Sequence, residues 1–138
     1  MTVHPSNADI QAAIVAKLKA ATNVTALVPA VEIRENQWQG VEFDYPNIRV
    51  RMISNTPQDF EGCDIVDFTL GVQVHSEEAS SYQADRIAGI IQSVLHGHPW
   101  STADLLITLR TSNLVPAIRS DARTWRAEVL MTGLASKS

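Results

Sequence analysis

Length, composition and charge limit what this chain can be. It has 138 residues, 45% of them hydrophobic and 19% charged, which suits one globular domain with a substantial core and excludes a disordered chain. A net charge of −4 argues against a protein whose main task is to bind phosphates. Cys63 is the only cysteine, which excludes an internal disulfide and a cysteine-rich zinc module. Neither a signal peptide nor a membrane span is visible, so we expect a cytoplasmic protein without membrane contact.

A first helix is predicted over about residues 7–21. Ser6 and Asp9 form a capping box at its start, with Asp in place of the usual Glu or Gln. Apolar side chains then recur every four residues, which places them on one face of a helix. These side chains are Ile10, Ile14 and Leu18. The apolar residues at 24–28 indicate one more helical turn, which Pro29 ends.

A second helix is predicted over residues 81–96. Ser80 and Gln83 have the spacing of a capping box, and Gly97 supplies the stop signal. Gly89 inside this helix costs about 1 kcal/mol relative to alanine, and we expect it to permit close packing on the sheet.

The strongest strand signal lies at residues 65–75, where five apolar positions alternate strictly with more polar ones. Four further strands are predicted at residues 31–34, 48–53, 104–111 and 123–132. The element order is therefore α-β-β-β-α-β-β. Strands that follow one another between two helices favour an α+β fold, with a mainly antiparallel sheet and two helices packed on one face. We expect a single domain over residues 1–138, with flexible ends at 1–6 and 134–138.

Motifs with a chemical role are scarce. The six glycines form no phosphate-binding loop, and no GxSxG nucleophile elbow occurs. The helix dipole explains His96 and His98 at a helix end better than a metal site does. Cys63 fits a small residue at a strand edge, and the acidic residues between 59 and 67 fit solvated loop charges. We therefore predict no catalytic residue, no metal site and no cofactor.

Arginines on the polar faces of the predicted strands are candidates for binding. Arginine is enriched at protein interfaces together with aromatic residues. The strands lack interleaved aromatics for stacking bases, which favours a protein partner over nucleic acid. The aromatic residues of the irregular loop 35–45 either fill their own core or contact a neighbour. The candidate interface residues are Trp38, Phe43, Tyr45, Arg49, Arg51, Asp59, Phe60, Glu61, Arg110, Arg119, Arg123 and Arg126.

The order of elements and several local segments resemble a known family. The helix at 8–20 is followed by TALV at 25–28, VEI at 31–33, the proline-entered strand YPNIRVRMIS at 45–54, FTLGVQVH at 68–75, and the helix over 81–96 that ends in LHG at 95–97. Over about residues 8–133 this layout resembles the tail-completion family of long-tailed bacteriophages, which includes tail terminator proteins. His75 stands where that family usually has an aromatic residue or an aspartate.

The resemblance implies a structural virion assembly protein and not an enzyme. Such proteins form a ring, typically hexameric, at the head-proximal end of the tail tube, where they end tube polymerisation and present a surface for head-to-tail joining. The expected partners are further copies of the chain, the tail tube protein and head-completion or connector proteins. DNA would only pass through the ring, without sequence-specific binding. The expected location is the tail or neck of the virion, after assembly in the host cytoplasm.

Three alternatives remain open. A head-completion or connector protein of the neck would bind the portal side instead. A small enzyme would use His75 or the pair His96 and His98, and it would require a pocket with perturbed histidines. A nucleic-acid module would use the strand arginines, and its binding would fall steeply with salt.

Overall fold

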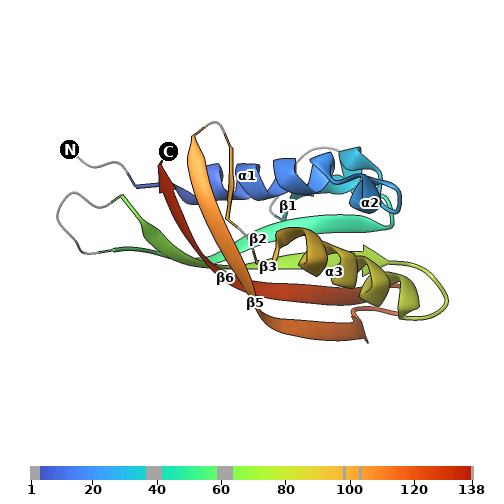
Figure 1. Ribbon diagram of the computed structural model, residues 1–138. Coiled ribbons are helices and arrows are strands. Elements are labelled where there is room, and N and C mark those ends of the chain that lie inside the picture. The colour runs from blue at the N-terminus through green and yellow to red at the C-terminus, as the bar shows by residue number, and fades with distance from the viewer. Residues whose placement is uncertain (1–3, 37–41, 59–63, 98, 103, 138) are drawn as a thin grey trace.

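One six-stranded sheet organises the fold of the computed structural model (Figure 1). The structure describes residues 4–36, 42–58, 64–97, 99–102 and 104–137. The strands are β1 (Ile33–Glu35), β2 (Asn47–Pro57), β3 (Val66–Ser76), β4 (Trp100–Ser101), β5 (Leu105–Arg119) and β6 (Trp125–Lys137). Their order in space is β1-β2-β3-β6-β5-β4, with β1 parallel to β2 and the other neighbours antiparallel. The predicted α+β fold with a mainly antiparallel sheet is confirmed.

The helices begin close to where the sequence indicates. They are α1 (Asn7–Ala20), α2 (Thr22–Thr25), the 3-10 helix η1 (Ala30–Glu32) and α3 (Tyr82–Leu95). The capping box of α1 is confirmed, since Ser6 Oγ accepts from Asp9 N at 3.1 Å and Asp9 Oδ2 accepts from Ser6 N at 3.2 Å. The capping box predicted for α3 is wrong. Gln83 Oε1 instead accepts a hydrogen bond from Ser76 Oγ at 2.5 Å, at the end of β3.

The apolar faces of α1 and α3 join the sheet in one hydrophobic cluster. In Figure 1, α1 runs beside β1 and β2, and α3 lies along β3 and β6. The packing contacts of α3 are with β3, β6 and β5. The predicted stripe of α1 is fully buried, as are Ile87 and Ile91 of α3. Each buried aliphatic side chain contributes about 1.5–3 kcal/mol relative to an exposed one. Burial of these stripes therefore holds both helices on the sheet.

β3 is the central strand and confirms the clearest strand prediction. It pairs with β2 on one side and with β6 on the other over its whole length. All five apolar positions of the predicted alternation are buried, and these are Val66, Phe68, Leu70, Val72 and Val74.

Other parts of the sheet differ from the predicted strands. β5 continues to Arg119, beyond the predicted end at 111. The prediction missed this extension because register shifts at 111/113 and 115/118 interrupt the two-residue alternation by which a strand is recognised. β6 runs to Lys137, so residues 134–137, expected to be flexible, pair with β5. The predicted order also lacks β4, which with two residues is too short to show a period. It lacks η1 and α2 as well, although α2 overlaps the further turn indicated at 24–28.

Two glycines inside regular elements have opposite surroundings. A Cβ on Gly133 of β6 would lie 2.6 Å from Thr108 O and 2.8 Å from Phe68 Cζ. A Cβ on Gly89 of α3 would have no described atom within 4 Å apart from its chain neighbours and the nearby backbone of its own helix. The predicted role of Gly89 in close helix–sheet packing is therefore wrong, whereas Gly133 does permit close packing between strands.

Alanine at these two positions should change stability in opposite directions. Gly89→Ala should raise the free energy of unfolding by up to about 1 kcal/mol, because alanine is the better helix former. Gly133→Ala should lower it by about 1–3 kcal/mol, because the methyl group overpacks the space around Phe68. Urea denaturation of both variants beside the wild type measures the two effects. A Gly133→Ala variant as stable as the wild type would contradict the tight packing at this position.

Candidate interface on the outer face of the sheet

The sheet face opposite the hydrophobic cluster, which we call the outer face, carries a row of basic side chains. Because side chains alternate along a strand, the burial of Ile48 and Val50 places Arg49 on the outer face. The register continues the row, since His75 of β3 lies opposite Arg126 of β6. The charges of both arginines act on His75. We define the basic band as Phe43, Tyr45, Arg49, His75 and Arg126.

Phe43 lies between two guanidinium groups. The Cζ atoms of Arg34 and Arg49, which are neighbours in the parallel register of β1 and β2, each lie 4.4 Å from its ring centre. Such cation–π contacts contribute about 0.5–2 kcal/mol each. Burial lowers the pKa of Arg49, an effect that Tyr45 partly offsets and the charge of Arg34 reinforces. Phe43 thus packs within its own chain, whereas Tyr45 is exposed.

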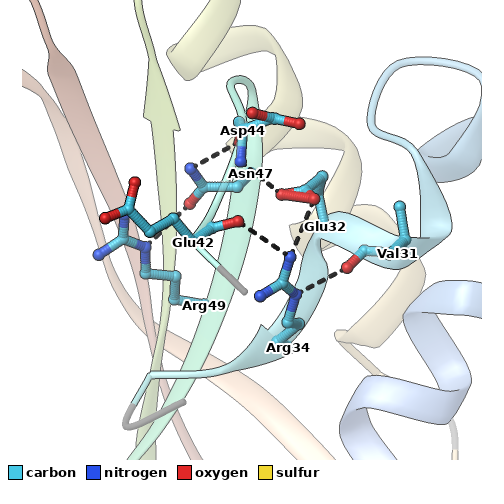
Figure 2. A network of polar contacts seen from close by, with 7 residues as sticks. All are labelled: Val31, Glu32, Arg34, Glu42, Asp44, Asn47 and Arg49. Carbon is cyan, nitrogen blue, oxygen red and sulfur yellow. Dashed lines mark hydrogen bonds and ion pairs between the residues drawn. The ribbon is translucent and has the colours of Figure 1, made fainter. Parts of the chain in front are cut away.

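A buried ion pair fixes the segment that precedes β2 (Figure 2). Glu32 Oε1 accepts a hydrogen bond from Arg34 Nη2 at 2.9 Å, and both side chains are only 7% exposed. Glu32 Oε2 accepts a second hydrogen bond, from Asp44 N at 2.7 Å. Arg34 Nε donates to Val31 O at 2.7 Å. The Glu32 carboxylate therefore joins the end of η1 to the segment 42–47.

Two further hydrogen bonds extend this network to Arg49, as Figure 2 shows. Asn47 Nδ2 donates to Asp44 O at 3.0 Å, and Asn47 Oδ1 accepts from Arg49 Nε at 2.9 Å. Asn47 is buried, so both bonds are shielded from water. The orientation of Arg49 in the basic band thus depends on contacts that begin in η1.

His75 is the titratable group of the basic band. The residue is 8% exposed, and its Nε2 lies 3.3 Å from Gln73 Oε1. Burial lowers the pKa of His75 to about 4, and the charges of Arg49 and Arg126 act in the same direction. The imidazole is therefore neutral near neutral pH. The positive charge of the band comes from its arginines.

The other arginines predicted from the sequence lie outside the basic band. Arg51 pairs with Glu128 across β3, with Nε 2.7 Å from Oε2. Arg110 lines a separate hollow of about 350 Å³, together with residues near the C-terminal end of β2 and the N-terminal end of β3. Arg119 stacks on an aromatic ring of β6, with 4.9 Å from its Cζ to the ring centre. Arg123 is exposed in the turn between β5 and β6.

Sequence reasoning reached only part of this arrangement. The candidates Trp38, Asp59, Phe60 and Glu61 lie outside the described residues. The network residues Glu32, Arg34 and Asn47 were not singled out. A signal was present for the first two, because opposite charges two residues apart in an extended segment share one face. Nothing in the sequence indicates that Asn47 is buried.

The residues considered for catalysis or metal binding do not form a reaction centre in the described part of the chain. His96 ends α3, as expected, and its Nδ1 accepts a hydrogen bond from Thr111 N at 2.9 Å. Cys63 and His98 lie outside the described residues. Among the side chains that are described, no three of His, Cys, Asp or Glu are placed to hold a metal ion. None of the described helices has the length and apolar character that a membrane crossing requires.

These features define a small α+β protein with a basic surface on the outer face of its sheet, and a buried hydrogen-bond network holds Arg49 within that surface. The family model of tail completion protein gp17 matches residues 12–132, and the chain belongs to this family. A chain from the virion of a native gene transfer agent particle has a similar fold, with a TM-score of 0.69 and 16% identity over 94% of this chain and 95% of that chain. No curated protein sequence matches. Family membership confirms the predicted resemblance, and with it a structural role in tail assembly.

The buried neutral His75 should make stability depend on pH. Its pKa is about 4 in the folded chain and 6.5 when solvated, so the unfolded state binds the proton first as the pH falls. The contribution of the neutral His75 to the unfolding free energy is fully present above pH 6.5 and is lost as the pH falls toward 4. Between pH 7.5 and pH 5, we expect the wild type to lose about 2 kcal/mol more unfolding free energy than His75→Gln. Urea denaturation at both pH values measures this difference, and equal losses would show that His75 is solvated.

Removal of the buried carboxylate should cost much more than removal of an exposed one. Glu32→Ala deletes the group that joins Arg34 to Asp44 N, and we expect a loss of about 3–5 kcal/mol in unfolding free energy. Glu35→Ala, which removes an exposed carboxylate of β1, is the matched control and should change it by at most about 0.5 kcal/mol. Urea denaturation at pH 7 tests both. Similar losses in the two variants would mean that the ion pair does not hold the segment before β2.

Proposed function

We propose that the chain forms a ring at the head-proximal end of the tail tube, where it ends tube polymerisation and provides the surface for head-to-tail joining. The observation that carries this proposal is the match to the tail completion family over residues 12–132. The likeness in fold to a chain of a gene transfer agent virion supports a place in a phage-like particle. The protein acts by assembly, not by catalysis, and its location is the tail or neck of the virion after assembly in the host cytoplasm.

The outer face supplies one contact surface for this role. Arg49 is held by the buried network and by the Phe43 ring, so it loses little further side-chain freedom when it binds. Planar guanidinium groups suit carboxylates, so the basic band fits an acidic surface on the tail tube protein or on a connector protein. The remaining candidate residues, from Arg51 to Arg123, would extend contacts around this centre.

Charge is compatible with a ring through which DNA passes. The chain carries a net charge of −4, which disfavours tight binding to the DNA backbone. On the outer face, Arg51 is already paired with Glu128. We propose that the DNA contact is transient and independent of sequence.

A head-completion or connector protein of the neck is the alternative within the same structural class. It would bind the portal side through similar surfaces and would leave tube length unchanged. The family match and the fold are compatible with both, so the distinguishing property is the partner.

Purified chain added to polymerising tail tube protein should shorten the tubes and cap one end, as seen by negative-stain electron microscopy. Arg126→Glu should weaken capping about tenfold, because it reverses a charge in the basic band. Arg86→Glu, an exposed arginine of α3 that is not among the candidate interface residues, is the matched control and should cap like the wild type. Uncapped tubes of unchanged length with wild-type protein would contradict the terminator role, and binding to portal-side proteins alone would establish the alternative.

A further inference from the structure

The edge of the sheet at β1 bears a groove that neither the fold nor the basic band requires. It lies between α1 and β1 and has a volume of about 610 Å³. Pockets of about 300–1,000 Å³ hold compact ligands of several side chains in size. We propose that this α1–β1 groove receives the turn between β5 and β6 of a second copy of the chain. The inference rests on the proposed ring and specifies the contact that closes it.

The groove has an apolar floor and an acidic rim. Its α1 wall is lined by Ala8, Ala12 and Val15, whose short side chains leave room for a partner. On the opposite wall, Val31 is 67% exposed, which makes it the most exposed aliphatic side chain among the described large hydrophobic residues. Exposed apolar surface of this kind marks a contact site.

Charges at the rim of the groove favour a basic partner. Among the described residues that line the groove, Glu35 and Asp44 carry negative charges and Lys19 carries a positive one, while the charges of the buried Glu32–Arg34 pair cancel each other. The groove is therefore complementary to an apolar residue flanked by arginines.

The hairpin tip, which we define as residues 118–124, has this composition. Ile118 is 49% exposed, and the exposed Arg119 and Arg123 follow it along the chain. The turn is already ordered, because Asp121 Oδ1 accepts hydrogen bonds from Arg123 N at 2.8 Å and from Thr124 N at 2.9 Å. These bonds lower the pKa of Asp121 and keep it ionised. A preorganised turn binds with a smaller entropy cost than a flexible loop.

The edge of β5 cannot add directly to the edge of β1 of another copy. His96 Nδ1 accepts a hydrogen bond from Thr111 N at 2.9 Å, and Asp85 Oδ1 accepts one from Ala117 N at 2.8 Å. Pro116 between them has no N–H group to donate. Blocked backbone donors and proline on an edge strand prevent sheet extension. Contact between copies through β5 therefore occurs by side chains of the hairpin tip.

The groove and the hairpin tip lie at opposite sides of the sheet, since β1 is one edge and β5 lies next to the other edge. Each copy can therefore use its groove for one neighbour and its tip for another. Such a heterologous contact makes a closed ring when the rotation between copies closes. The asymmetry of the two surfaces thus supplies the geometry that the proposed ring needs.

Two substitutions with matched controls test the contact. Ala12→Arg fills the groove, whereas Ala16→Arg makes the same change one turn further along α1 and outside the groove lining. Ile118→Asp alters the hairpin tip, whereas Leu106→Asp alters a side chain of similar exposure, 45%, at the far end of β5. Circular dichroism verifies that all four variants fold. Light scattering at high protein concentration, with and without tail tube protein, measures the assembly.

We expect Ala12→Arg and Ile118→Asp each to have the mass of one chain, while both controls form rings like the wild type. A mixture of Ala12→Arg with Ile118→Asp should stop at the mass of two chains, because one intact groove meets one intact tip and the other contact is blocked on both sides. Rings from either blocking variant, or a mixture that stays monomeric, would overturn the docking contact alone. A wild type that forms no ring, even with tube protein, would overturn the proposed function and the contact with it.

Discussion

The register of the central strand β3 is the constraint on which the other features depend. Its apolar positions must face the hydrophobic cluster, and a shift by one residue would turn all of them to the opposite side. β2 and β6 pair along β3 and inherit this choice. Packing of the core therefore decides, indirectly, that Arg49, His75 and Arg126 come together on the outer face.

The buried Glu32–Arg34 pair adds a second level of order at the β1 edge. Burial of two opposite charges gives little net stabilisation unless their remaining hydrogen-bonding groups also find partners. Here the carboxylate also accepts from a backbone N–H, and the guanidinium also donates to a backbone carbonyl. The pair therefore specifies one path for the segment before β2, and that path sets both the Phe43 stack and one wall of the α1–β1 groove.

The two sides of the sheet have opposite properties, and this bears on assembly. At β5, side chains from both ends of α3 accept hydrogen bonds from edge N–H groups, and two register shifts distort the strand. At β1, a short parallel strand borders an open apolar groove. A sheet with one protected side and one receptive side avoids unlimited edge-to-edge growth. It also leaves two different surfaces, which the proposed ring would use for its two neighbours.

The sequence by itself determined α1, β3 and α3 and the α+β class. Each of these elements is encoded by apolar residues that repeat every two positions or every three to four, so local periodicity is sufficient. The tail-completion resemblance was also accessible, because it depends on the order of such elements. Local reasoning failed where the period is interrupted, as at the register shifts of β5, or where a strand is as short as β4.

Only the tertiary structure decided which polar residues act together. Arg49, Arg126 and His75 lie on three strands, and only strand pairing makes them neighbours. The depressed pKa of His75 and the burial of Asn47 depend on how much water the fold removes, which no local pattern records. The sequence thus specified the elements through short-range periodicity. Long-range packing specified the surface, because proximity and desolvation arise only when distant segments meet.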